Sequence, residues 1–330
     1  MTRLGLALTG GLSPWDVIEC VRLAEDLGYE SAWIAEGHGG DQFALLAACA
    51  LHTRRIRLGT GVSSVFVRSI PTLAMAAATV DHLAQGRFLL GLGSSHRVQV
   101  EPEHGLAYSK PVQRVRDSVA IIRALLRDGA VSYQGETVRI AHFDFWFTPY
   151  RPQIPIYLAA LFPPMLEVCG ELAEGVLLTR STLATARQVA GPLATGARRA
   201  GRRPEEIDIA SLLPCSVAAS RQEALDALRP GVAFYVGFFP RYRRLMAESG
   251  FAEAAAAIHA AWQRGDRQAA VRAVPDALIA STGVVGTPAE CQERLAAYRH
   301  SGIALPIISP FTRVADGKQR ALEAIRACAP

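Results

Sequence analysis

The sequence predicts an α/β fold, a (β/α)8 TIM barrel that forms one domain over residues 1–330 and carries a helical insertion before its last strand. Short apolar runs alternate with amphipathic stretches, recur at intervals of roughly 25 to 30 residues, and are apolar almost throughout. This spacing is typical of βα units with right-handed crossovers, and continuous apolar runs are typical of parallel strands buried on both faces. Eight such runs favour a closed barrel over the alternative, an open doubly wound sheet.

The expected strands follow one another along the chain as these apolar runs. They are residues 4–8, 31–35, 56–62, 88–92, 154–160, 175–179, 207–217 and 305–309. The first helix begins where Ser13 can cap it and Pro14 takes its first position, and apolar residues then recur at helical spacing until Gly28 ends it. Further helices are expected over residues 42–52 and 71–83.

Two segments interrupt this rhythm. Residues 128–153 are rich in turn residues and aromatic side chains, and predict an excursion that contains a β-hairpin. Residues from about 218 to 285 are rich in alanine and arginine, and predict the helical insertion. The insertion contains the aromatic run FYVGFF, residues 234–239, which is expected either to pack in a core or to roof a site.

Composition excludes several classes of protein. Half of the residues are hydrophobic and 20% are charged, which supplies a large core and excludes a disordered chain. The sequence shows no secretory signal, and its apolar runs are far shorter than the ~20 residues of a membrane span, so we expect a cytoplasmic protein with no membrane partner. The six cysteines are far apart without a CxxC motif, so we expect buried thiols and no metal site.

The net charge of +5 is carried by arginine, since the chain has only two lysines. Arginine clusters occur at residues 54–57, 198–203 and 241–244, but they do not form a basic stripe interleaved with stacking aromatics, and no nucleic-acid reading motif is present. We therefore expect no nucleic-acid partner. Each cluster is expected to be a solvated helix face, with attraction of an anionic ligand or cofactor tail as the alternative.

Residues that carry chemistry gather where three expected strands end, and barrel enzymes place their sites on these loops. After the second strand, Glu36, His38 and Asp41 lie among glycines, which suits proton transfer, with a merely polar loop as the alternative. At the end of the third strand, Gly59 and Gly61 allow the backbone to approach a flat ligand. The fourth strand ends in GLGSSH, whose GxG is weak evidence for a dinucleotide site and fits a tight turn at the barrel mouth better.

Longer stretches of the chain resemble one family. The string LGTGVSSVFVRSIPTLAMAAATVDHLAQGRFLLGLGSS, residues 58–95, resembles the signature of the bacterial luciferase-like flavin- and deazaflavin-dependent oxidoreductases. The loop EGHGGD, residues 36–41, resembles a deazaflavin-dependent branch near the coenzyme F-420-dependent methylenetetrahydromethanopterin reductases. IPIYLAA at 154–160 and VGTPAE at 285–290 also fit, so the resemblance runs from residue 4 to about 310. At the position of the Gly61–Val62 bond many members of this family hold a cis peptide.

The resemblance implies a barrel whose strand ends hold a flavin or its deaza form. It implies Glu36 and His38 as catalytic residues beside the polar edge of the ring, with Glu36 positioning His38, the first candidate for the proton donor. Phe66, Arg68 and His96 are assigned to the substrate, and His96 is the second candidate for the proton donor. The implied cofactor contacts, of which the last five lie toward the ribityl and phosphate end, are Gly37, Gly61, Val62, Ser63, Ser94, Ser95, Ala159, Ala160, Leu161, Thr179 and Arg180.

The chain departs from this family after the fifth expected strand. Relatives commonly carry a glycine there, where the backbone closes on the phosphate, and this chain has Phe162-Pro163-Pro164. Phe162 adds bulk, and the two prolines remove two N–H donors. The departure bears on the phosphate contacts of the cofactor rather than on the fold.

The leading functional hypothesis is hydride transfer between reduced coenzyme F-420 and an electrophilic C=N, C=C or C=O group of a small-molecule substrate. One alternative is an FMNH2-dependent two-component monooxygenase, since the same barrel serves both chemistries. A second alternative is a barrel that has lost its cofactor and acts as a binding protein, which the departure at Phe162 supports. The resemblance also implies a homodimer and a separate enzyme that reduces the cofactor.

Overall fold

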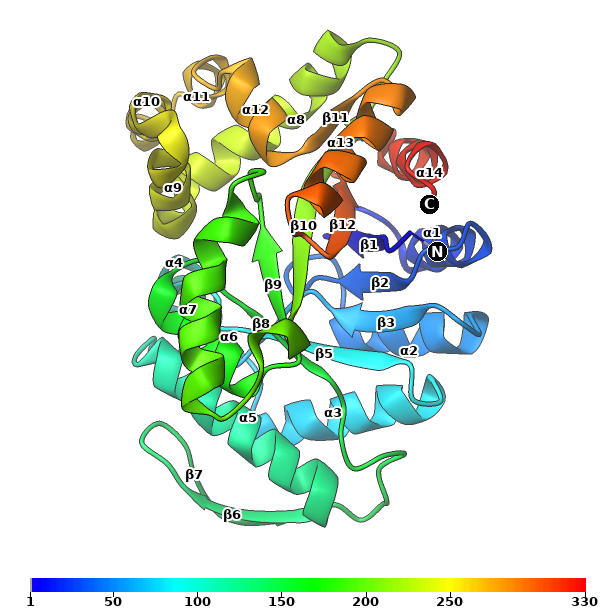
Figure 1. Cartoon of the computed structure of the whole chain (residues 1–330), viewed down its shortest axis with the longest axis vertical. Coiled ribbons are helices and arrows are strands. Elements are labelled where there is room, and N and C mark those ends of the chain that lie inside the picture. Colours follow the sequence, from blue (N-terminus) through cyan, green and yellow to red (C-terminus); the bar gives the residue numbers. More distant parts are fainter. Residues whose placement is uncertain (1) are drawn as a thin grey trace.

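The computed structural model describes residues 2–330 and contains the predicted closed barrel (Figure 1). Its parallel strands pair in the ring β1-β2-β3-β5-β8-β9-β10-β12, and β12 pairs back onto β1. The eight strands are β1 (Gly5–Leu8), β2 (Ser31–Ile34), β3 (Arg57–Thr60), β5 (Phe88–Gly93), β8 (Ile156–Ala159), β9 (Gly175–Thr179), β10 (Asp208–Val217) and β12 (Leu305–Pro310). Each extends at most one residue beyond its predicted run, so the (β/α)8 prediction is confirmed and the open sheet is excluded.

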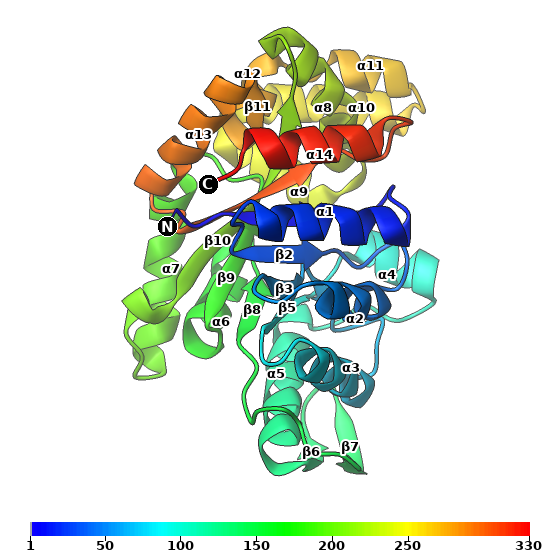
Figure 2. The same ribbon diagram turned by 90° about the vertical axis from the view of Figure 1, so that its right-hand side faces the viewer.

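Helices cover the outside of the barrel, as two perpendicular views show (Figures 1 and 2). They are α1 (Pro14–Asp26), α2 (Gln42–His52), α3 (Ile70–Leu83), α4 (Arg97–His104), α5 (Pro111–Asp128), α6 (Pro163–Leu172), α7 (Thr185–Arg199), α13 (Pro288–His300) and α14 (Gly317–Ala327). The Ser13 side chain accepts a hydrogen bond from the Asp16 N–H, which confirms the predicted cap of α1. Among residues 2–330, no helix combines the length and apolarity that crossing a membrane requires.

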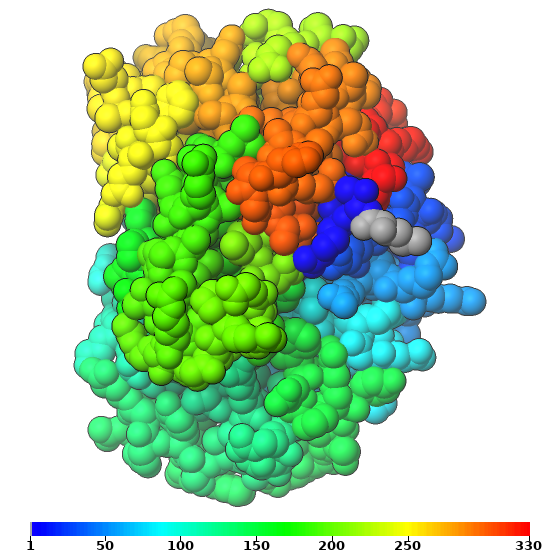
Figure 3. Space-filling model, viewed as in Figure 1, coloured from blue at the N-terminus to red at the C-terminus, as the bar shows by residue number. Residues whose placement is uncertain are grey.

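Both segments predicted to interrupt the βα repeat, the hairpin and the helical insertion, are present in the structure. The first contains an antiparallel hairpin of β6 (Ala130–Gln134) and β7 (Arg139–Asp144). The second is helical and has its own apolar cluster, with α8 (Arg221–Phe238), α9 (Pro240–Met246), α10 (Ala252–Gln263), α11 (Arg267–Arg272) and α12 (Asp276–Thr282). In the space-filling view this insertion, yellow to orange, forms one end of the molecule (Figure 3).

Two short strands were not predicted. The third expected strand ends at Thr60, and the chain resumes pairing with β5 only at β4 (Ser63–Ser64). After the insertion, β11 (Val284–Gly286) pairs with β10 beside the barrel. Thr287 then starts α13 with a capping box to Glu290, which explains the VGTPAE string as a strand-to-helix turn.

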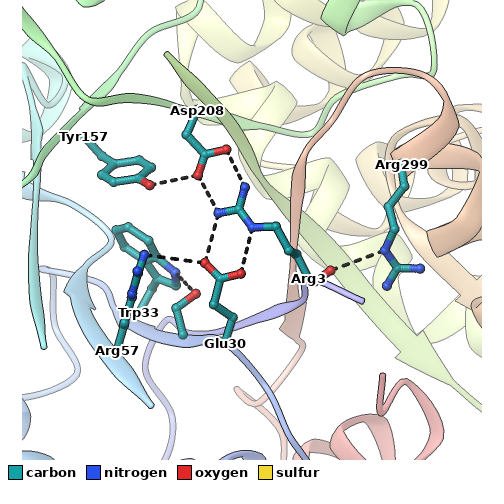
Figure 4. Close-up of polar contacts among 8 residues, drawn as sticks. Arg3, Glu30, Trp33, Arg57, Tyr157, Asp208 and Arg299 are labelled. Carbon is teal, nitrogen blue, oxygen red and sulfur yellow. Dashed lines mark hydrogen bonds and ion pairs between the residues drawn. The ribbon is translucent and has the colours of Figure 1, made fainter. Parts of the chain in front are cut away.

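A polar cluster lies at the amino-terminal end of the barrel, opposite the ends where sites form (Figure 4). Arg3 donates to both oxygens of Glu30, at 2.7 and 2.9 Å, and to both oxygens of Asp208, at 2.8 and 2.7 Å. The Tyr157 hydroxyl donates to Asp208 at 2.8 Å, and Tyr157 packs edge-on against Trp33 inside the barrel. Arg3 thus ties the segments before β1 and β2 to the start of β10, at the face of the barrel where side chains serve stability.

Replacing Arg3 by alanine is expected to lower the free energy of unfolding by about 1–2 kcal/mol, because Glu30 and Asp208 would be left as neighbouring carboxylates without a cation. The full penalty of a buried pair does not apply, since the Arg3 side chain is 37% exposed. Urea unfolding measures the effect. Arg127→Ala is the matched control, since its ion pair with Asp128 is surface-exposed on both sides, and a loss as large as that of Arg3→Ala would contradict the role of the cluster.

Candidate active site

A cavity of about 1520 Å3 lies at the carboxyl ends of the barrel strands. The residue just after seven of the eight barrel strands, or one residue further on, lines it: Thr9, Ala35, Gly61, Ser94, Ala160, Arg180 and Phe311. Pockets for one small ligand usually measure about 300–1,000 Å3, so this cavity has room for a large cofactor together with a second molecule.

The cavity brings together most of the residues singled out from the sequence. Those that line it are Glu36, Gly37, His38, Gly61, Val62, Arg68, Ser94, Ser95, His96, Ala159, Ala160, Leu161, Thr179 and Arg180. They come from the carboxyl ends of β8 and β9 and from the loops after β2, β3, β5, β8 and β9, which are far apart in sequence. The closure of the barrel is what makes them neighbours.

Ser63 and Phe66 do not line the cavity. The Ser63 side chain is buried, and its hydroxyl donates to Gln42 Oε1. Successive side chains of a strand point to opposite faces, so Ser64 lines the cavity and Ser63 points away from it. The Phe66 ring stacks on Tyr108 with centroids 4.6 Å apart and is 6% exposed. The structure therefore does not bring Ser63 or Phe66 to the cavity wall, where the expected contacts with the cofactor and the substrate would be made.

Glycines in β5 make room for the bond between Gly61 and Val62, which is cis, as the resemblance implied. A Cβ at Gly91 would lie 1.9 Å from the Thr60 carbonyl oxygen, and one at Gly93 would lie 2.6 Å from a methyl group of Val62. The GxG of this strand therefore serves the close packing of β3 and β5. It is not part of a dinucleotide fingerprint.

Glu36 is held by partners other than His38. Its carboxylate accepts from the Ser64 N–H at 2.7 Å and from Arg68 Nε at 2.6 Å, and Arg68 also donates to Asp41 at 2.7 Å. The Arg68 guanidinium holds the pKa of Asp41 below its ordinary value. Glu36 and Arg68 thus fix β4 against the loop after β2, and the structure does not place Glu36 in contact with His38.

His38 lies at the mouth of the cavity, where its side chain is 79% exposed. Its Nε2 lies 3.3 Å from the carboxylate of Glu103, which comes from α4 and also lines the cavity. Glu103 was missed from the sequence, because nothing in the local pattern of α4 indicates that this helix reaches the loop after β2.

His96 lies deeper, against the insertion. Its ring centroid is 4.7 Å from that of Phe239 and 5.2 Å from that of Tyr242. Burial, together with the nearby Arg241 guanidinium, lowers the pKa of His96 to about 4. His96 is therefore neutral at pH 7, where it can accept a proton or a hydrogen bond but cannot act as an imidazolium acid.

The carboxyl end of α8 and the start of α9, residues 234–244, form an aromatic roof over one side of the cavity. The roof residues that line the cavity are Phe234, Tyr235, Phe238, Phe239, Arg241, Tyr242 and Arg244. Arg241 anchors the roof to the barrel, since it donates to Ser94 Oγ and the Ser95 carbonyl, both at 3.1 Å, and to the Tyr108 hydroxyl at 2.7 Å. Of the two expectations for the aromatic run, the structure supports the roof.

The structure offers no metal centre within residues 2–330, because no three histidine, cysteine or acidic side chains there are arranged to hold an ion. All six cysteines are free and buried. Burial raises the pKa of the Cys20 and Cys49 thiols to about 12, so these groups are protonated core side chains.

Comparison with known proteins agrees with the fold. The 5,10-methylenetetrahydromethanopterin reductase of Archaeoglobus fulgidus is 30% identical over 305 residues, which cover 91% of each chain. The coenzyme F-420-dependent tetrahydromethanopterin reductase of Methanopyrus kandleri superposes with a TM-score of 0.85 at 24% identity, over 99% of this chain and 98% of that one. An F-420-dependent secondary alcohol dehydrogenase bound to an F-420–acetone adduct superposes with a TM-score of 0.79 at 19% identity, over 100% and 99% of the two chains.

The sequence family described as luciferase-like monooxygenase matches residues 1–305, nearly the whole barrel. The match covers all the loops that line the cavity up to the end of α13 and the start of β12. The chain therefore belongs to the luciferase-like monooxygenase family, as its signature stretches indicated.

Proposed function

We propose that this protein is an oxidoreductase that transfers hydride between the reduced deazaflavin coenzyme F-420 and an electrophilic C=N, C=C or C=O group of a small-molecule substrate. The observation that carries the proposal is the large cavity, which is lined by the apolar side chains of Val62, Leu177 and Leu212 and by arginines such as Arg180 and Arg244. The similarity of the chain to a reductase and a dehydrogenase that depend on this coenzyme supports the same function.

The residues of the cavity fit the coenzyme. A flat ring fits the floor formed by Val62, Leu177 and Leu212, three apolar side chains that line the cavity. Ser94 and Ser95 also line the cavity and offer hydroxyl groups to the ring or the ribityl chain. When bound, the coenzyme supplies or accepts the hydride, and the protein orients the substrate against it and excludes water.

Reduction of a carbonyl or imine also requires a proton, which the chain can supply at the cavity mouth. His38 is the candidate donor, and the Glu103 carboxylate, 3.3 Å from its Nε2, gives the imidazolium form an ion-pair partner. His96 is neutral and better suited to accept a hydrogen bond from the substrate. Arg68, whose charge is shared by two carboxylates, holds the loop that carries His38.

The first test is a titration of the purified apoprotein with coenzyme F-420 and, separately, with FMN, followed by fluorescence quenching. We expect the deazaflavin to bind at least tenfold more tightly, a difference of about 1.4 kcal/mol. The opposite preference would favour the alternative, an FMNH2-dependent monooxygenase, which the name of the family also suggests. Binding of neither cofactor would favour the second alternative, a binding protein.

The proposal includes partners of a definite kind. A deazaflavin oxidised in one turnover must be reduced again, so a separate reducing enzyme is proposed to regenerate it. A homodimer is proposed with it, on the resemblance to the family alone, and the cytoplasm is proposed as its location. Sedimentation of the purified chain at micromolar concentration tests the dimer directly.

A further inference from the structure

The amino terminus of α6 faces the cavity but offers a ligand no backbone donor in its first turn. Pro163 and Pro164 occupy the first two helical positions and have no N–H. The N–H groups of Met165 and Leu166 both donate to the Phe162 carbonyl, at 3.1 Å. Helix amino termini that follow a barrel or sheet strand commonly bind phosphate through free N–H groups. In this chain those donors are absent or already used.

An arginine without a counter-ion lies at the neighbouring strand end. Arg180 directly follows β9, which pairs with β8, the strand that leads to Phe162. Arg180 is 8% exposed, and its guanidinium carbon lies 4.0 Å from the centroid of the Tyr235 ring. No carboxylate of residues 2–330 forms an ion pair with it. A buried charge without a partner destabilises a protein, so its presence at a cavity points to a negative charge on the ligand.

A second arginine, Arg244, lines the cavity from the roof. The Arg244 guanidinium carbon lies 4.2 Å from the centroid of the Phe162 ring, at the start of α6. Its Nε donates to Glu248 at 2.7 Å, and this bond leaves the two terminal amino groups for another acceptor. Phe162, the residue that departs from the family, thus serves as the platform on which Arg244 rests.

The charges around the cavity are divided between its two sides. The acidic side chains that line it, Glu36, Asp41 and Glu103, come from the loop after β2 and from α4. Each of them already lies beside a cationic or titratable group, Arg68 or His38. Of the other arginines that line the cavity, Arg241 comes from the roof and Arg313 from the segment after β12, whereas Arg180 directly follows β9 and Arg244 lies against Phe162, which follows β8.

We propose that Arg180 and Arg244 form a side-chain anion site that binds the phosphodiester of the deazaflavin coenzyme, in place of the backbone donors that the prolines remove. This inference rests on the proposed function, and it assigns a role to Phe162, Pro163, Pro164 and the roof that the function alone does not require. Guanidinium groups suit the task, because their planar array of N–H donors matches phosphate oxygens.

The test compares coenzyme F-420 with its phosphate-free chromophore, 8-hydroxy-5-deazariboflavin, in fluorescence titrations at low and high salt. Arg180→Gln is expected to weaken F-420 binding about tenfold or more, and Arg244→Gln by a smaller factor, because charged hydrogen bonds to phosphate are lost. Both variants should bind the chromophore within about twofold of the parent protein. Arg180→Lys should recover part of the loss. The salt dependence of F-420 binding should fall in both glutamine variants.

Thermal unfolding of the apoprotein separates this role from a structural one. Arg180→Gln should leave Tm unchanged or raise it, since a buried unpaired charge is removed. Arg203→Gln is the control, because its ion pair with Glu206 is exposed. A lower Tm with equal loss of both ligands would overturn the proposal in favour of a structural arginine.

Two further outcomes would overturn the inference in different ways. If the parent protein binds neither deazaflavin, the proposed function fails and the inference fails with it. If the variants bind F-420 normally but lose stabilisation by inorganic phosphate, the site takes an anionic group of the substrate and the assignment to the coenzyme is wrong.

Discussion

Gly91→Ala is expected to lower the free energy of unfolding by about 3 kcal/mol or more, a large effect for adding one methyl group. The added Cβ would lie 1.9 Å from the Thr60 carbonyl oxygen and 3.2 Å from a methyl group of Val62. The backbone oxygen cannot move away, because the Thr60 hydroxyl donates to the Gly91 carbonyl at 2.7 Å and accepts from the Gly91 N–H at 2.8 Å. Strands β3 and β5 would have to separate at the cavity floor.

Urea unfolding of Gly91→Ala beside Gly191→Ala checks this expectation. Gly191 lies within α7, and a Cβ there would meet nothing within 4 Å. Alanine in a helix is favoured over glycine by about 0.5–1 kcal/mol, so the control should be neutral or slightly more stable. If Gly91→Ala were equally well tolerated, the close approach of β3 and β5 would not be the reason for the GxG string.

The barrel was predictable because its determinants are local. Runs such as IPIYLAA are apolar on both faces, as buried parallel strands are. The segment between most successive runs is long enough for one helix, so the order of the strands in the barrel follows their order in the chain. Helix starts are also determined locally, since Ser13 and Asp41 cap the amino termini of α1 and α2 through their own side chains. The break between β3 and β4 was not predictable, since no residue type in Gly61-Val62-Ser63 marks where pairing stops.

The sequence predicted which strand ends surround the site, but not which side chains point into it. Sequence position tells which loops surround the cavity, because all parallel strands end on the same face. It does not tell which of two adjacent serines, Ser63 or Ser64, points inward, since that depends on register after the break. Partners from distant segments, such as Glu103 for His38 and Arg241 for Ser94, are set by tertiary packing and carry no local signal.

The position of the arginine cluster at residues 241–244 could not be predicted from the sequence either. A solvated helix face was the default expectation, with attraction of an anionic cofactor tail as the alternative. The structure places Arg241 and Arg244 on the cavity wall, because α9 turns back over the ends of β5 and β8. The sequence shows that this cluster is positively charged, but the path of the insertion determines where in the structure the charge lies.

The protein is expected to lose about 2 kcal/mol of unfolding free energy between pH 7 and pH 5 through His96 alone. In the folded state the pKa of His96 is about 4, chiefly because of burial, whereas an exposed imidazole titrates near 6.5. Between these values the unfolded chain binds a proton that the folded chain does not. Acidification therefore favours unfolding, and the His96 contribution is complete above pH 6.5 and lost as the pH falls toward 4.

His96→Gln removes this group and should make the stability difference between pH 7 and pH 5 smaller by the same amount. His142→Gln is the control, because the His142 side chain is 65% exposed and its removal should leave the difference as it is. Urea unfolding of the three proteins at both pH values gives the comparison. A parent protein and a His96→Gln variant with the same pH dependence would mean that water in the cavity solvates His96, which lines it beside Phe239 and Tyr242, and that burial does not lower its pKa in solution.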